Sequence, residues 1–305
     1  MNSGFGLGSV FAATVLVAPA LAQTTTWESL AARQSHAMAS AGGRVFLAGG
    51  LGVNPLQSSQ PVLRDVHRGT FGVGTAGWAR DPSMPRTLRD HAAAGLTISG
   101  QSVFFVFGGI SAAGVPTSTT TKHTGRTPDD IITAFDPGPR FGHAMVRVPG
   151  QNGQPDWILM FGGFGSSRLN DVWKFDPSGP TWTQLLPNAP GAGLPTARFQ
   201  HSMAYHETSN RIYVFGGNIG IADAGVWELD PNATPPAWSH IPATGAAPSA
   251  RNSAAMAYFP VNNTLEVVSQ IETNMVLVLL TAKCFLLGDG QAHIPNSHRR
   301  TVGCN

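Results

Sequence analysis

Histidine and arginine recur in this sequence at a spacing that could serve metal binding, acid–base chemistry or anion binding. A histidine followed by small apolar residues occurs four times, with an arginine just upstream of each. A catalytic residue is needed once, so four copies of one pattern favour a role in the fold, such as satisfying backbone groups beside a channel. The histidines are His36, His91, His143 and His201, and the arginines are Arg33, Arg89, Arg140 and Arg198, with a fifth at Arg251.

Each histidine begins a unit that ends in two glycines. The apolar runs "VFLAGG", "VFFVFGG", "WILMFGG" and "RIYVFGG" end in the pairs Gly49-Gly50, Gly108-Gly109, Gly162-Gly163 and Gly216-Gly217. A fifth unit, "ARNSAAMAYFPVNNTLEVVSQ", aligns with "ARFQHSMAYHETSNRIYVFGG" but has Ala254 in place of the histidine. Copies recur at roughly fifty residues, which identifies a repeat protein.

Short β-type runs must position these residues. After the glycines come "NDVWKFDP" and "TWTQLL" in the third unit and "AGVWELDP" and "AWSHI" in the fourth, so each unit predicts four strands separated by turns. We expect Trp182 and Trp238, on the fourth runs, to wedge between neighbouring sheets. We expect the glycine pairs to mark points where backbones approach closely.

These motifs resemble the kelch-repeat β-propeller family, which includes the propeller of galactose oxidase, over roughly residues 24 to 268. The resemblance implies an all-β propeller of four-stranded blades, about five of them visible. In the second unit the third and fourth strands must come from "PTSTTTKHT" and "DDIITAF", without a tryptophan. It also implies a ring closed by mixed termini, for which "TTTWESL" has the pattern of a fourth strand.

The ends of the chain differ from the repeats. Residues 1–22 resemble a signal peptide because the apolar "FAATVLVAPALA" ends in an A-x-A-like site, although its positive n-region is missing; the alternative is a disordered or buried apolar N-terminus. We expect the propeller at 23–270 and a divergent tail at 271–305, which is either a diverged third strand or the product of an unspliced donor at Val268-Ser269. The predicted location is secreted, or periplasmic in a bacterium.

Composition argues against several functions. The net charge of +2 gives no reason to expect a nucleic-acid partner, and no apolar stretch is long enough for a membrane span. Galactose oxidase chemistry, as the resemblance implies it, needs tyrosine and histidine ligands and a Tyr–Cys crosslink. The chain has only Tyr205, Tyr213 and Tyr258, and both cysteines, Cys284 and Cys304, lie in the tail. We therefore expect no cofactor, no metal and no catalytic residue.

Function is then expected in loops on one side of the ring. The candidate ligand-binding residues are Arg64, His67, Arg68, Lys122, His123, Arg168 and Asn170, each of which could instead be an ordinary solvated side chain. The five repeated arginines could form a positive ring, or could each pair with a neighbouring acid or carbonyl. The sequence predicts a secreted scaffold that binds a protein or carbohydrate; the alternative is a secreted carbohydrate-active enzyme, galactose oxidase-like or sugar mutarotase-like.

Overall fold

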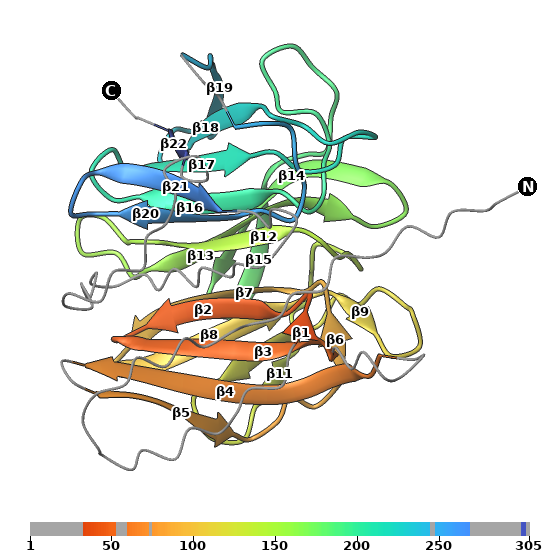
Figure 1. The fold of residues 1–305 in the computed structure, drawn as a ribbon, viewed down its shortest axis with the longest axis vertical. Helices are drawn as coiled ribbons and strands as arrows, with labels where there is room; N and C mark the ends of the chain where they lie inside the picture. The colour runs from red at the N-terminus through yellow and green to blue at the C-terminus, as the bar shows by residue number, and fades with distance from the viewer. Residues whose placement is uncertain (1–32, 53–59, 73–74, 245–247, 269–299, 303–305) are drawn as a thin grey trace, which may run out of the picture.

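The computed structural model describes residues 33–52, 60–72, 75–244, 248–268 and 300–302, and in these it contains strands and turns but no helix. The strands form successive antiparallel sheets, the blades, stacked side by side (Figure 1). Blade 1 consists of β2 (Ala37–Ala41), β3 (Arg44–Gly52), β4 (Val62–Gly72) and β5 (Thr75–Asp81), with β1 (Arg33–Gln34) paired to the end of β3.

Blade 2 contains the irregular runs of the second repeat. Its strands are β7 (Ala92–Ile98), β8 (Gln101–Phe107), β10 (Thr120–His123) and β11 (Asp129–Ile131), and β6 (Leu88–Arg89) pairs separately with β9 (Ile110–Ser111). The third and fourth strands therefore form where the sequence predicted them, without a tryptophan.

Blades 3 and 4 are the most regular. Blade 3 runs β12 (Ala144–Val148), β13 (Trp157–Phe164), β14 (Arg168–Asp176) and β15 (Thr181–Leu186). Blade 4 runs β16 (Ser202–His206), β17 (Arg211–Phe215), β18 (Val226–Asp230) and β19 (Ala237–Ile241). Blade 5 has three described strands, β20 (Ala255–Phe259), β21 (Thr264–Val268) and β22 (Arg300–Val302), and β22 takes the third-strand position beside β21.

The inner strands follow one another around a central cavity. β2 packs beside β7, β7 beside β12, β12 beside β16 and β16 beside β20. Together they line a cavity of about 420 Å³, in which Glu207 is the one carboxylate among the described lining residues. The all-β kelch-type propeller predicted from the sequence is confirmed. The predicted signal peptide at residues 1–22 and the segment "TTTWESL" lie outside the described residues.

Apolar side chains fill the spaces between neighbouring blades. The ring of Trp182 lies 4.9 Å from that of Phe107 in the preceding blade, and Trp238 lies 4.8 Å from Phe161 in the same way. Trp182 also donates a hydrogen bond from Nε1 to Thr120 Oγ1 at 3.0 Å. Both tryptophans therefore pack against the preceding blade, which confirms the wedge predicted for them.

The ring has two different ends. At one end, called here the Gly-Gly end, the second strands finish in their glycine pairs and long connections run at 110–119, 132–140, 187–197 and 218–225. At the other, called the hairpin end, connections of two to eight residues join the first strand to the second in each blade. The Gly-Gly end is the right-hand end in Figure 1, where β1, β6 and β9 lie.

Candidate functional site

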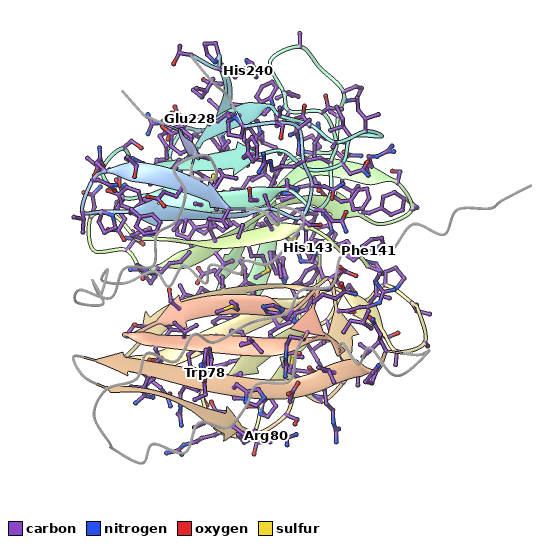
Figure 2. All side chains as sticks on the ribbon, viewed as in Figure 1. Trp78, Arg80, Phe141, His143, Glu228 and His240 are labelled. Carbon is purple, nitrogen blue, oxygen red and sulfur yellow. The ribbon has the colours of Figure 1, made fainter. Side chains whose placement is uncertain are left out.

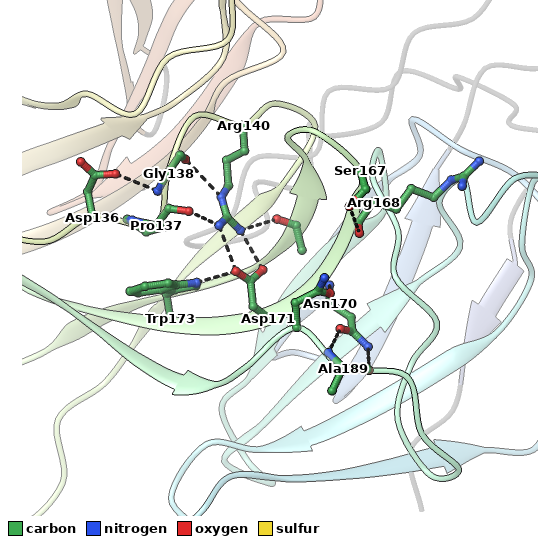
Figure 3. A network of polar contacts seen from close by, with 12 residues as sticks. Asp136, Pro137, Gly138, Arg140, Ser167, Arg168, Asn170, Asp171, Trp173 and Ala189 are labelled. Atoms are coloured by element: carbon green, nitrogen blue, oxygen red, sulfur yellow. Dashed lines mark hydrogen bonds and ion pairs between the residues drawn. The ribbon is translucent and has the colours of Figure 1, made fainter.

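Three of the five repeated arginines are buried at the Gly-Gly end and paired with carboxylates. Arg140 donates to both oxygens of Asp171, at 2.8 and 2.9 Å, to the carbonyl of Gly162 at 3.0 Å and to the carbonyl of Pro137 (Figure 3). Asp171 accepts a further hydrogen bond of 2.7 Å from Trp173 Nε1. The guanidinium therefore ties the start of blade 3 to its second and third strands.

The same arrangement recurs in two other blades. Arg33 pairs with Asp65 at 2.8 Å, and Arg198 pairs with Asp223 at 2.7 Å. Burial alone would raise the pKa of Asp65, but the hydrogen bonds from His67 and Arg33 hold that pKa well below its ordinary value. Of the two interpretations of the arginines, these three fit the pairing with neighbouring acids and not an open positive ring.

The glycine pair of one blade lies against the histidine of the next blade, and this contact is called here the joint between blades. A Cβ on Gly163 would lie 2.8 Å from His143 Cβ, and a Cβ on Gly162 would lie 3.2 Å from Cε1 of His201 in the next blade. The first glycine thus makes room for the histidine ring of the following blade, and the second makes room for the histidine of its own blade. Blade 5 has Ala254 at the histidine position, so the joint at Gly216 contains no imidazole ring.

Burial keeps the joint histidines uncharged near neutral pH. It lowers the pKa of His91 to about 4, and burial with the nearby charge of Arg198 lowers the pKa of His201 to about 3. Nε2 of His91 lies 3.1 Å from the carbonyl oxygen of Ala48 in the preceding blade, which is the role in satisfying a backbone group that the sequence suggested. Imidazoles with such low pKa values are poor general bases at neutral pH.

A belt of backbone hydrogen bonds runs around the cavity mouth at this end. The residue just before each histidine position has a positive φ, and in blades 2 to 5 its N–H donates to the matching carbonyl of the preceding blade. The bonds run from Asp90 to Ser35 (2.9 Å), Gly142 to Asp90 (2.8 Å), Gln200 to Gly142 (2.6 Å) and Ser253 to Gln200 (2.8 Å).

Large apolar side chains are exposed at this end of the propeller. Four of the five exposed large hydrophobic side chains among the described residues belong to the connections of the Gly-Gly end: Val115, Ile132, Phe135 and Ile221. Half-buried Phe141, Phe164 and Phe199 form a cluster between blades 3 and 4, with ring centroids 5.4 to 6.0 Å apart. Phe141 lies farther toward the Gly-Gly end than His143 (Figure 2). We call these seven residues the apolar surface.

All seven ligand-binding candidates from the sequence lie in strands and not in loops. Arg64, His67 and Arg68 belong to β4, and Lys122 and His123 belong to β10. His67 contacts Asp65 at 2.8 Å, Arg68 pairs with Asp81 at 3.3 Å, and His123 Nε2 lies 2.8 Å from the carbonyl oxygen of Pro82. The expected single loop face is therefore corrected: strands begin earlier than the loop composition indicated, and several of these side chains make internal contacts.

The other two candidates belong to the start of β14, at the Gly-Gly end. Asn170 is buried and bonds Ala189 and Pro195, so that it holds the 187–197 connection onto β14 (Figure 3). Arg168 stands opposite Phe164 in the β13–β14 hairpin, and among the described residues its buried Nε has no hydrogen-bond partner. Arg168 is thus the candidate that the structure places beside the apolar surface.

The sequence analysis missed the apolar surface itself. The "RF" pairs at Arg140-Phe141 and Arg198-Phe199 were the available signal, since a phenylalanine recurs there beside a buried arginine. Among the described residues no group of three His, Cys, Asp or Glu side chains is arranged to hold a metal ion. Within the same residues there is also no helix that could cross a membrane.

Comparison with known proteins agrees with this architecture. The family model for the KLHDC2/KLHL20/DRC7 Kelch-repeats domain matches residues 117–270. Kelch domain-containing protein 10 from Xenopus tropicalis is 28% identical over 184 residues, which cover 53% of this chain and 38% of that protein. Putative adagio-like protein 2 from Oryza sativa is 29% identical over 226 residues, covering 68% of this chain and 34% of that protein. The chain thus spans well under half the length of these relatives.

A solved structure supports the fold. The structure of YjhT superposes with a TM-score of 0.56 at 14% sequence identity, covering 77% of this chain and 71% of that one. The matched family model covers half of the chain and the blades repeat with kelch spacing. This chain therefore belongs to the kelch-repeat family of β-propellers.

Proposed function

We propose that this protein is a binding scaffold that receives a protein partner on the apolar surface at its Gly-Gly end. The observation that carries the proposal is the uneven distribution of exposed hydrophobic side chains. Val115, Ile132, Phe135 and Ile221 are 58%, 96%, 63% and 73% exposed at that end, whereas Val261 is the one such residue of the described hairpin end. Clustered exposed apolar side chains mark interaction surfaces.

The framework beneath this surface suits binding without rearrangement. Arg140–Asp171 and Arg198–Asp223 fix the starts of blades 3 and 4, and the phenylalanine cluster lies between those blades. A rigid support lowers the entropy lost on association. Aliphatic side chains in the loops favour a protein over a carbohydrate, because sugar hydroxyls require polar partners in their binding sites.

The test locates the partner on the surface. A photocrosslinking amino acid is placed at Ile221 or, as control, at Val261, which is similarly exposed at the opposite end. The partner captured from Ile221 is then purified and its dissociation constant measured against variants. We expect Phe135→Asp and Ile221→Asp to weaken binding at least about tenfold, with Val261→Asp close to the unmodified protein. Equal losses in all three variants would contradict the proposal.

We also propose that the protein is exported, on the basis of the apolar segment ending at Ala22. Its N-terminus, sequenced from protein recovered outside the producing cell, is expected to begin at Gln23. Recovery only of intracellular protein that retains Met1 would refute export.

A further inference from the structure

A second surface feature lies at the hairpin end, between blades 1 and 2. Phe46 and Phe104 stack across this seam with ring centroids 5.1 Å apart and planes 8° from parallel. Successive side chains of a strand alternate between faces, so residues two apart share a face. Arg44 precedes Phe46 by two residues and Ser102 precedes Phe104 by two residues. The two polar side chains therefore face each other across the seam, one step closer to the hairpin end.

Two glycines bring the blades together at this point. A Cβ on Gly95 of β7 would collide with the backbone carbonyl of Ser40 in β2. A Cβ on Gly42, in the turn between β2 and β3, would lie 2.5 Å from Ser102 Oγ. The Ser102 hydroxyl is therefore held against the Gly42 turn, and its position is set by backbone packing.

These residues line a polar pocket of about 380 Å³. Its described lining contains no carboxylate and consists of Gly42, Arg44, Ser99, Gly100, Gln101, Ser102 and Thr124. The pocket thus combines a guanidinium, three hydroxyl groups, an amide and two tight turns. We call it the seam pocket.

Arg44 is the charge that sets the character of the seam pocket. It is exposed, and no described residue forms an ion pair or hydrogen bond with its guanidinium. The nearby Arg68, by contrast, is already paired with Asp81 at 3.3 Å. Ser102 as a residue is 9% exposed, and its hydroxyl, which shares no hydrogen bond with a described residue, is open to solvent. The pocket therefore holds one uncompensated positive charge beside a hydroxyl group that is free to bind a ligand.

We propose that the seam pocket binds the phosphate or sulfate ester of a sugar. Arginine is the side chain best suited to a tetrahedral oxyanion, and hydroxyl groups of serine and threonine donate to the same oxygens. The volume exceeds what a bare oxyanion fills, and Gln101 and Ser99 offer donors and acceptors for sugar hydroxyls. This site lies at the opposite end from the apolar surface and does not depend on the proposed protein partner.

Isothermal titration calorimetry on the full chain tests the proposal, with glucose 6-phosphate, glucose 6-sulfate and glucose as probes. We expect one saturable site for at least one ester, weakened by added salt because the attraction is electrostatic, and much weaker binding of glucose. Arg44→Gln is expected to weaken ester binding about tenfold or more, and Ser102→Ala severalfold. Arg64→Gln is the matched control, because Arg64 is an exposed arginine of the same blade that does not line the pocket.

The outcomes separate clearly. Binding of one ester and not the other supports the site and identifies its anion. Glucose binding as tight as that of its esters, or the same affinity in Arg44→Gln as in the unmodified protein, overturns the proposal. An equal loss in Arg64→Gln and Arg44→Gln also overturns it, because the attraction is then a general property of the surface. Unchanged thermal unfolding in Arg44→Gln establishes that a loss of binding is not a loss of folding.

Discussion

At the scale of single residues, blade 3 contains two arginines in opposite circumstances. The side chain of Arg140 is 3% exposed and that of its partner Asp171 is 4% exposed, whereas those of Arg147 and Asp156 are 44% and 24% exposed. Breaking a buried pair leaves an uncompensated charge in a poorly solvated site, while an exposed pair is screened and contributes little. The two arginines therefore form a matched comparison of burial.

Replacing Arg140 is expected to be far more costly than replacing Arg147. Arg140→Gln leaves the Asp171 carboxylate buried without its cation and should lower the free energy of unfolding by about 3–5 kcal/mol. Arg147→Gln should lower it by no more than about 1 kcal/mol. Urea unfolding of both variants measures the difference. Similar losses in the two variants would mean that the buried pair does not hold blade 3.

Sequence patterns predicted well those residues whose role repeats locally. The glycine pairs, Trp182 and Trp238 stand at fixed places in every good copy of the unit, so their contacts could be predicted by comparing repeats. Arg44 and Ser102 could not be paired in advance, because they meet only when two blades pack. The apolar surface was missed for the same reason, since exposure of Ile221 depends on how several connections meet.

At the scale of elements, β13 shows why its glycines are required. Gly163 has φ near +103°, in a region that residues with a Cβ rarely adopt, and the His143 side chain and Phe141 carbonyl occupy the space beside it. The strand pairing between β13 and β14 shifts register at this position. The strand end, the turn and the histidine of the same blade thus depend on one residue without a side chain.

Gly163→Ala is expected to destabilise the protein, because the new methyl group meets both backbone strain and His143. We expect a loss of at least about 1–3 kcal/mol, the usual cost of a sparsely populated backbone conformation. Gly179→Ala is the control, since Gly179 has open space around it and no positive φ, and should be neutral or slightly stabilising. Thermal unfolding of the two variants checks the prediction, and equal melting temperatures would contradict it.

At the scale of the whole molecule, stability is built from contacts between neighbouring blades. The inner strands contact one another in chain order, and blades 2, 3 and 4 each place a buried histidine in the joint with the preceding blade. The histidines are His91, His143 and His201. Burial lowers the pKa of all three below the 6.5 of an exposed imidazole. Acid is therefore expected to destabilise all three joints in the same way.

The ring is expected to lose stability as the pH falls below about 6.5. In that range the unfolded chain takes up protons on these imidazoles and the folded chain does not, so the free energy of unfolding falls by up to about 1.4 kcal/mol per pH unit for each histidine. The loss continues down toward pH 4, where His91 begins to be protonated in the folded state as well. Urea unfolding across this range measures the slope.

His201→Gln should reduce that slope by the share of one histidine, whereas His240→Gln, at an exposed position, should leave it unchanged. A free energy of unfolding that is flat between about pH 7 and about pH 5 would contradict the role of the buried histidines.

The joint between blades also bears on how such a chain can change during evolution. Each joint is formed by the first glycine of one repeat and the histidine of the next repeat. A single repeat therefore contains no complete joint. If a duplication or deletion begins and ends at equivalent positions of two repeats, a glycine pair again meets the histidine of the following repeat, and the joint is preserved. A substitution within one unit changes a joint that two units share. Copying entire repeats is therefore the easier route for this architecture.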